Sequence, residues 1–189
     1  SESARYQMGL CLEALDRSSE ALQVYETLVS EVPEGRWALD AQLRRGYCLE
    51  RLGRSDEAAQ LYEGLHGRLR AADLEVGLTL RQGIALYQGQ RFGRAAMLIG
   101  TGLAALKTLE PSLKPELAPT AAEAAYTLGE VARRDVNALQ LGLDDLENLF
   151  AQKSERIRKA RKFYVDAVAY KDAEWAARRA QEWGAQLSF

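Results

Sequence analysis

The stretch RRGYCLERLGRSDEAAQLY, residues 44–62, decides how this chain folds. Its pattern predicts a helix, a turn at Gly53 and a second helix that begins near Ser55. Gly46 lies inside the first helix, where a glycine costs about 1 kcal/mol relative to alanine. A glycine at this position indicates a close approach of two helices that leaves no room for a side chain.

The same pattern occurs three times, with a period of 37 residues. The first two copies share, among other residues, Gly9, Glu13, Ala21 and Tyr25 with Gly46, Glu50, Ala58 and Tyr62. The third copy keeps Gly83 and Ala95, and Ile99 replaces the tyrosine. Self-similarity at a fixed period is the signature of a repeat architecture.

Each copy is predicted to form two helices. A short turn separates them at residues 16–17, 53–54 and 89–90, where glycine suits a left-handed C-terminal cap. We expect Ser55 to cap the second helix, and Ala58 to face Gly46 so that the two backbones approach closely. One hairpin buries little surface, so neighbouring copies must stack to build a continuous core.

The spacing Gly9-x11-Ala21-x3-Tyr25-x7-Pro33 resembles the signature of the tetratricopeptide repeat (TPR). The resemblance implies an all-α fold, a right-handed superhelical solenoid of antiparallel helix pairs. The period exceeds the usual length of about 34 residues. In this the chain is similar to outer-membrane-associated TPR proteins of the bacterial envelope, and its C-terminal part loosely resembles TPR proteins of myxobacterial gliding motility.

The repeats divide the chain into three parts. Residues 1–110 are expected to hold three TPR-like repeats. Three of the four prolines fall in residues 111–119, which predicts a loop, because proline disrupts helices. Residues 120–189 are expected to form a degenerate, extended repeat plus a terminal helix. Gly129 and Ala160 are 31 positions apart, against 12 in the first copies, which indicates longer helices or a small inserted element.

Composition and charge argue against several classes of protein. The chain is 47% hydrophobic and carries a net charge of -2, so no bulk attraction to nucleic acid or anionic lipid is expected. No apolar run reaches the roughly 18 residues of a membrane span. The chain begins at Ser1 without a leader pattern, and we expect any targeting signal to lie outside it. The envelope resemblance favours a periplasmic or outer-membrane-associated location, with a cytoplasmic one as the alternative.

Residues that carry chemistry are sparse. His66 is the only histidine, and neither a nucleophile motif nor a Gly-rich phosphate loop accompanies it, so we expect no catalytic residue. Cys11, Cys48 and His66 lack metal-ligand spacing, so no metal or other cofactor is expected, and both cysteines are expected to be buried thiols. The basic run 153–162 is expected to be a solvated helix face or, alternatively, a docking surface for an acidic partner.

The TPR resemblance also implies a concave groove lined by the first helix of each repeat. Tyrosines in such a groove supply contact area at low entropy cost. The residues expected to bind a partner are Tyr6, Glu13, Asp40, Arg44, Tyr47, Glu50, Arg81 and Tyr87. Leu10, Leu43, Leu80 and Ile84 lie at the same repeat offsets and are expected to be either groove residues or inter-repeat core.

These patterns together predict a non-catalytic scaffold that holds a peptide or helix of a partner protein in the groove, in a bacterial envelope or motility complex. No small-molecule substrate, nucleic acid or membrane insertion is expected. The Lys and Asn with which TPR co-chaperones hold a C-terminal carboxylate are missing here, and only Arg81 fits, so that activity is not expected. The alternative is an oligomerisation module, in which Trp175 and Trp183 contact a second copy.

Overall fold

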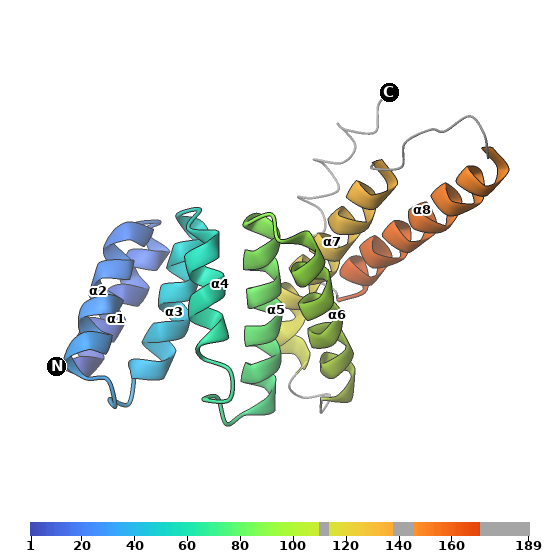
Figure 1. Ribbon diagram of the computed structural model, residues 1–189. Coiled ribbons are helices and arrows are strands. Elements are labelled where there is room, and N and C mark those ends of the chain that lie inside the picture. The colour runs from blue at the N-terminus through green and yellow to red at the C-terminus, as the bar shows by residue number, and fades with distance from the viewer. Residues whose placement is uncertain (110–113, 138–145, 171–189) are drawn as a thin grey trace.

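The computed structural model describes residues 1–109, 114–137 and 146–170. Within these residues the chain is all-α and its helices pack pairwise, so the predicted fold class is confirmed (Figure 1). The helices are α1 Glu2–Ala14, α2 Ser18–Glu31, α3 Ala38–Arg51, α4 Ser55–Glu63, α5 Ala72–Gln88, α6 Phe92–Thr108, α7 Lys114–Asn137 and α8 Leu146–Ala169. None of these helices is long and apolar enough to cross a membrane.

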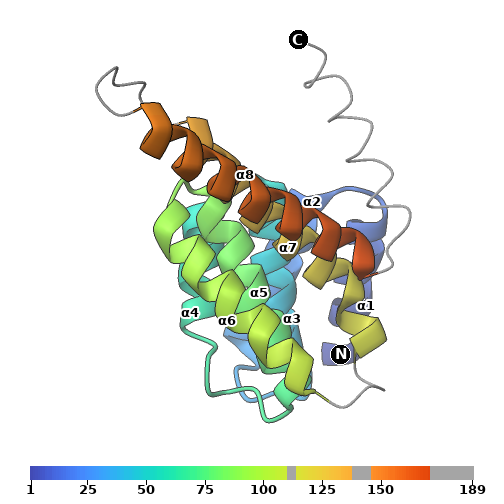
Figure 2. The ribbon, with the colours of Figure 1, turned by 90° about the vertical axis from the view of Figure 1, so that its right-hand side faces the viewer.

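The helices form a row in chain order. Helices α1 to α6 stand side by side, with α1 and α3 behind α2 and α4 (Figure 1). Each helix packs against the next in the chain, and α5 packs against α7 as well. Helix α8 lies across α7 at the end of the row (Figure 2) and projects away from the first helices (Figure 1).

The first three helix pairs turn through the same cap. The second residue after the first helix has a positive φ at Asp16 (60°), Gly53 (72°) and Gln90 (63°), at the period of 37. The next backbone N–H then donates to a carbonyl five residues earlier, as Arg54 does to Leu49 at 2.9 Å. A left-handed cap was expected at these turns, but only the second copy places a glycine in that conformation.

Gly46 makes room for an aromatic ring. A Cβ built on Gly46 would lie 2.8 Å from the phenol oxygen of Tyr62 on α4, and closer still to the ring. The same overlap links Gly9 to Tyr25. Ala58 was expected opposite Gly46, and the structure shows that the ring of Tyr62 fills the space where a side chain at residue 46 would lie.

Helix α5 is buried on two sides. Its residues Leu78 and Leu86 belong to a hydrophobic cluster that runs from α1 through α5 to the start of α6. Its residues Leu80 and Ile84 belong to a second cluster that joins α5, α6, α7 and α8. A helix that is apolar on most of its circumference is buried on most of it. Helix α5 therefore connects the two halves of the core.

The second half departs from the expected boundaries. Helix α7 begins at Lys114 and contains Pro115 and Pro119, so the loop predicted for residues 111–119 is wrong from residue 114 onward. Pro115 stands in the first turn, where the missing N–H has no helical partner to lose. Residues 111–113 lie outside the described part of the chain.

The extra residues between Gly129 and Ala160 mainly lengthen helices. Helix α8 begins 14 residues before Ala160, whereas α4 begins three residues before Ala58. An inserted element at residues 138–145 would lie outside the described residues, as does the terminal helix expected within residues 171–189.

Candidate functional site

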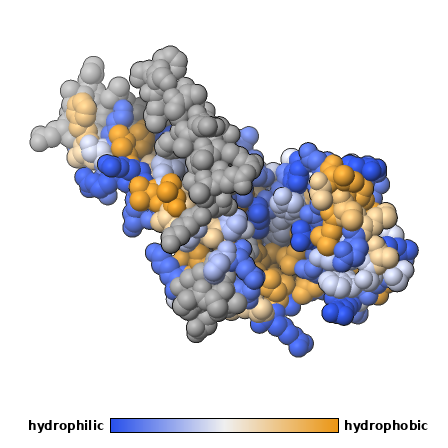
Figure 3. All heavy atoms as spheres, turned by 180° about the vertical axis from the view of Figure 1, so that it is seen from behind, coloured by the Kyte–Doolittle hydropathy of each residue, from blue (hydrophilic) through white to orange (hydrophobic). Residues whose placement is uncertain are grey.

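A groove of about 610 Å³ lies against α1, α3, α5 and the start of α7. Because α1 and α3 stand behind α2 and α4 in Figure 1, their outer face is the one seen in Figure 3, where apolar and hydrophilic side chains alternate. The groove is lined by Leu10, Glu13, Ala14, Leu43, Arg44, Tyr47, Arg51, Tyr62, Asp73, Leu74, Gly77, Leu78, Arg81, Leu117 and Thr120.

Tyr47 lines the groove beside two arginines. The guanidinium carbons of Arg51 and Arg81 lie 5.7 Å and 5.5 Å from the centroid of its ring. A cation within about 6 Å of an aromatic ring is attracted to the ring's face. The two arginines therefore hold the ring of Tyr47 in place while its edge stays half-exposed in the groove.

A buried carboxylate holds Arg44 at the groove wall. The hydroxyl of Tyr25 donates to Glu13 at 2.6 Å, and the guanidinium of Arg44 lies 3.2 Å from the other oxygen of the same carboxylate. Glu13 is 9% exposed, so its charge needs these partners. Burial lowers the pKa of Arg44, but Glu13 and Tyr6 outweigh that effect and the pKa rises overall.

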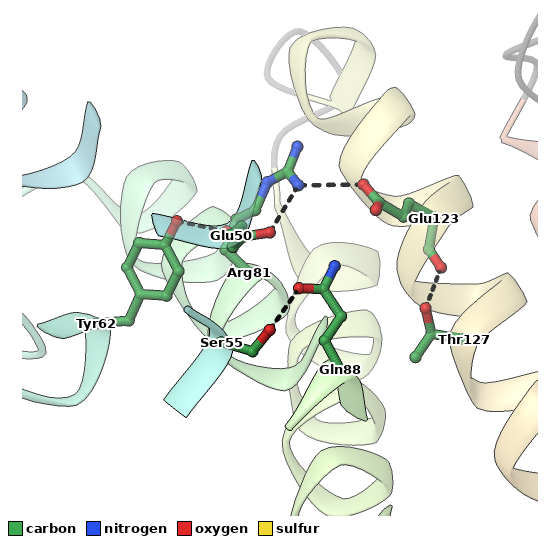
Figure 4. Close-up of polar contacts among 7 residues, drawn as sticks. All are labelled: Glu50, Ser55, Tyr62, Arg81, Gln88, Glu123 and Thr127. Carbon is green, nitrogen blue, oxygen red and sulfur yellow. Dashed lines mark hydrogen bonds and ion pairs between the residues drawn. The ribbon is translucent and has the colours of Figure 1, made fainter. Parts of the chain in front are cut away.

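The same arrangement recurs 37 residues later (Figure 4). The hydroxyl of Tyr62 donates to Glu50, and Arg81 lies 3.4 Å from Glu50 and 3.1 Å from Glu123 of α7. Arg81 therefore bridges the second, third and fourth helix pairs. The two units form a ladder in which each tyrosine and the arginine of the next repeat share one buried glutamate.

The electrostatics of Glu50 are unusual. Burial raises the pKa of its carboxyl from 4.5 to about 7, although Arg81 and the Tyr62 hydroxyl both favour the charged form. Burial also raises the pKa of the Tyr62 phenol, and Glu50 adds to that shift. Glu50 and Glu123 raise the pKa of Arg81, against the lowering effect of burial.

The third copy has lost the glutamate and the tyrosine together. Tyr87 stands at the position of Glu50, and Ile99 stands at the position of Tyr62. In the last helix pair a related contact returns, because the Tyr164 hydroxyl donates to Glu130 at 2.8 Å. The paired loss fits the physics, because a buried carboxylate without its hydroxyl donor is costly.

Half of the residues predicted to bind a partner line the groove, namely Glu13, Arg44, Tyr47 and Arg81. Glu50 is buried behind the lining. Tyr6 is buried as well, because it stacks on Trp37 with ring centroids 4.6 Å apart and its hydroxyl donates to Asp40. The half-buried Tyr87 packs its ring against Phe92. The structure therefore places Tyr6, Asp40, Glu50 and Tyr87 outside the lining.

Four apolar residues were expected to belong either to the groove or to the core, and two of them have each role. Leu10 and Leu43 line the groove. Leu80 and Ile84 are core residues, 0% and 2% exposed, because α7 packs on the side of α5 that carries them.

Sequence reasoning missed part of the lining. Leu74 is 47% exposed in the groove, but it lies nine positions before Gly83, outside the repeat offsets of the predicted groove residues. Leu117 and Thr120 come from the start of α7, in or beside the stretch predicted to be a loop. Recognising Pro115 as a residue of a first helical turn would have revealed this helix.

Three further expectations concern single residues. Cys48 is buried as expected, but Cys11 is exposed. Ser55 is the first residue of α4 rather than its N-cap, which is Arg54, and the Ser55 hydroxyl donates to Gln88 on α5 at 3.1 Å (Figure 4). His66 lies in the turn after α4, with one ring nitrogen 2.8 Å from Gln82.

Among residues 1–109, 114–137 and 146–170, no group of three or more His, Cys, Asp and Glu side chains is placed to hold a metal ion.

The tetratricopeptide-repeat family model matches residues 3–35 and 40–68, which include the first two copies of the Gly–Tyr pair. These two stretches are similar to tetratricopeptide repeats. The model matches about a third of the chain, and the pairwise packing of the helices extends the TPR-like fold through the other described residues. No curated protein matches this chain.

Two solved structures share the fold. One is a kinesin light chain of Podosopora anserina with nearly identical TPR-like repeats, 14% identical, with a TM-score of 0.50 over 89% of this chain and 94% of that chain. The other is a variant of the same protein, 15% identical, with a TM-score of 0.50 over 89% and 93%. Identities this low show a shared fold alone. TPR domains are in general modules of protein–protein interaction, and the fold is typically non-catalytic.

Proposed function

We propose that this TPR chain is a non-catalytic scaffold that binds a peptide or helix of a partner protein in the groove along α1, α3 and α5. The observation that carries the proposal is the centre of the groove, where Tyr47, held between Arg51 and Arg81, lies among exposed and half-exposed leucines. Tyrosine and arginine dominate the binding energy of protein interfaces, and leucines around them exclude water.

The buried ladder supports this role because it fixes the groove wall before a partner arrives. Glu13 holds Arg44, and Glu50 and Glu123 hold Arg81. Parts of both guanidinium groups remain exposed, with side-chain accessibilities of 43% for Arg44 and 27% for Arg81. A side chain ordered in advance loses less entropy on binding. The groove can therefore offer donors in fixed positions next to an apolar floor.

The partner we propose belongs to a bacterial envelope or motility complex. This part of the proposal rests on the lengthened repeats, whose period of 37 resembles that of envelope TPR proteins. It concerns where the scaffold acts, whereas the groove concerns how it binds.

The test begins with peptides selected from a displayed random library against the full chain. Tyr47→Ala and Leu74→Asp, both in the lining, should each weaken the selected peptides at least about tenfold, as loss of an interface anchor does. Met97→Asp is the matched control, because Met97 is 62% exposed on α6 and does not line the groove. Equal affinity for all three variants would show that the peptides bind elsewhere.

A cross-linking pull-down then searches for the natural partner, comparing the wild type with Tyr47→Ala. Arg44→Glu is unsuitable for this purpose, because it would place a second negative charge beside the buried Glu13. A partner that the wild type captures and Tyr47→Ala loses would identify the pathway. Capture of the same proteins by both chains would contradict groove binding.

Oligomerisation through the C-terminal helices is the second candidate. One observation favours it, since α8 exposes Ile157, Val165 and Val168, which are 50%, 58% and 62% exposed. The Trp175 and Trp183 contact expected for this candidate lies outside the described residues. Light scattering separates the two candidates, because a scaffold that binds through its groove can be a monomer and an oligomerisation module cannot.

A further inference from the structure

Arg81 is one cation between two carboxylates at the α5–α7 side of the groove (Figure 4). The same guanidinium nitrogen lies 3.4 Å from Glu50 and 3.1 Å from Glu123. In the first unit of the ladder, by contrast, Arg44 pairs with the single carboxylate of Glu13. The second unit therefore has one carboxylate in excess, and α7 supplies it.

Glu123 is the carboxylate of this unit that a bound partner can reach. Its side chain is 27% exposed, whereas that of Glu50 is 5% exposed. It comes three residues after Thr120, which lines the groove, so the two residues are neighbours on one face of α7. Among the described residues, one oxygen of Glu123 accepts from Arg81 and the other accepts no hydrogen bond. The second oxygen is therefore available to a ligand.

We propose that the partner segment carries a lysine or arginine whose charged group binds Glu123; this inference rests on the groove function proposed above. A cation at this place would balance the excess carboxylate beside Arg81. Complementary charges of this kind fix the register of a bound chain and exclude wrong partners. The apolar stem of such a side chain would lie on the apolar floor to which Leu74 and Leu117 contribute.

The charges of this wall disfavour an acidic partner residue here. Asp73 lines the groove and lies two turns before Arg81, on the same face of α5. With Glu50 ionised, the wall carries three carboxylates against the one guanidinium group of Arg81, so it would repel an aspartate or glutamate of the partner. Arg44 lies on the α3 side of the groove. The two sides therefore differ in charge, and the difference would set the direction in which the segment binds.

Protonation of Glu50 links this contact to pH. Glu50 faces Tyr62 of α4, Arg81 of α5 and Glu123 of α7. Burial raises the pKa of Glu50 to about 7, and the negative charge of Glu123 contributes to the rise. A cation bound to Glu123 offsets that contribution, so binding releases a proton from Glu50. The segment should therefore bind about two- to fivefold more tightly at pH 8 than at pH 6.

Peptides selected from the displayed random library test the contact with Glu123. Those that Tyr47→Ala weakens should share a lysine or arginine at one position, and replacing it with methionine should weaken binding about tenfold. Glu123→Gln should weaken the original peptide to a similar extent and leave the affinity of the methionine peptide unchanged. Glutamine keeps an oxygen that can accept from Arg81, so this variant should fold, and circular dichroism checks that it does.

Glu63→Gln is the matched control. Glu63 also pairs with an arginine, Arg94, but it lies on α4 outside the lining of the groove. The substitution should leave the affinities of both peptides unchanged. The dependence on pH is measured with a selected peptide that contains no histidine, and Glu50→Gln should remove it.

Groove peptides that share no basic residue, or whose affinity Glu123→Gln leaves unchanged, would overturn this inference while groove binding stands. An enrichment of aspartate or glutamate would overturn it in favour of an acidic partner. Equal weakening of the original and the methionine peptide by Glu123→Gln would also overturn it, because Glu123 would then act through Arg81 alone. Equal affinity at pH 6 and pH 8 would contradict a cation beside these carboxylates. Peptides that Tyr47→Ala does not weaken would overturn groove binding as well.

Discussion

The ring of Tyr62 occupies the space in which a side chain at residue 46 would lie, so Gly46 and Tyr62 form one packing unit across the α3–α4 pair. Gly9 with Tyr25 and Gly129 with Tyr164 repeat the relationship. In each of these three pairs the tyrosine hydroxyl also donates to a glutamate of the first helix. The glycine therefore admits the ring, and the ring places a hydroxyl beside a carboxylate that needs a donor.

Replacing Gly46 with alanine should lower the free energy of unfolding by about 1–3 kcal/mol, the usual range for overpacking. The better helix propensity of alanine, about 1 kcal/mol, offsets only part of this cost. Urea denaturation measures the difference. Gly100→Ala is the control, because Gly100 is inside α6 with open space around its Cβ position, and it should be neutral or stabilising. Equal effects at both positions would contradict the packing unit.

Removing the guanidinium of Arg81 should be costly because it leaves Glu50 without its cation. We expect Arg81→Met to lower the free energy of unfolding by about 3 kcal/mol or more, as for other broken buried pairs. Arg94→Met is the matched comparison, since Arg94 pairs with Glu63 at an exposed site and should cost less than about 1 kcal/mol. A similar loss in both variants, measured by urea denaturation, would argue against a special role for the buried pair.

The raised pKa of Glu50 predicts a pH dependence of stability. The folded chain holds a proton on Glu50 up to a pKa of about 7, whereas the unfolded chain releases it near 4.5. The folded state therefore binds more protons between these values, and this carboxyl makes stability fall as pH rises from about 4.5 to 7, by up to about 3 kcal/mol. Glu50→Gln should remove that contribution. Urea denaturation at pH 5 and pH 8 measures the difference in free energy of unfolding between the wild type and Glu50→Gln. A difference that is the same at both pH values would refute the raised pKa of Glu50.

The two thiols should differ sharply in reactivity. Cys11 is exposed, whereas burial raises the pKa of Cys48 to about 12, which leaves almost no thiolate at neutral pH. In native conditions one thiol per chain should react with a colorimetric disulfide reagent, and the second only after denaturant is added. Cys11→Ser should abolish the fast reaction. A fast reaction that persists in Cys11→Ser would mean that Cys48 is accessible.

The backbone of Gln90 has a conformation that a glycine would adopt without strain. Its φ of 63° lies in the left-handed region, where a side chain costs about 1–2 kcal/mol. Gln90→Gly should therefore raise the thermal midpoint, and Gly53→Ala, at the equivalent turn with a φ of 72°, should lower it. Changes of the same sign in both variants would contradict this account of the cap.

The spacing of residues along the chain was sufficient to predict the helix pairs of the first half of the protein. The period of 37 and the Gly–Ala–Tyr pattern predicted the helix pairs and their turns. The resemblance to TPR proteins implied a groove, and Leu10, Leu43 and Tyr47 do line one. Such features depend on which residues share one face of a helix, and the order of residues along the chain fixes that face.

The contacts between distant elements depended on the tertiary structure. Helix α7 packs against α5, so Leu80 and Ile84 are core residues, a choice that their repeat offsets had left open. The same packing brings Leu117 of α7 into the groove. The ladder through Glu50, Arg81 and Glu123 joins three helix pairs in the same way. Sequence alone determined the repeat and the faces of its helices, because these are local properties. Only the tertiary structure decided which faces were buried, because burial depends on the elements that the stacked repeats bring together.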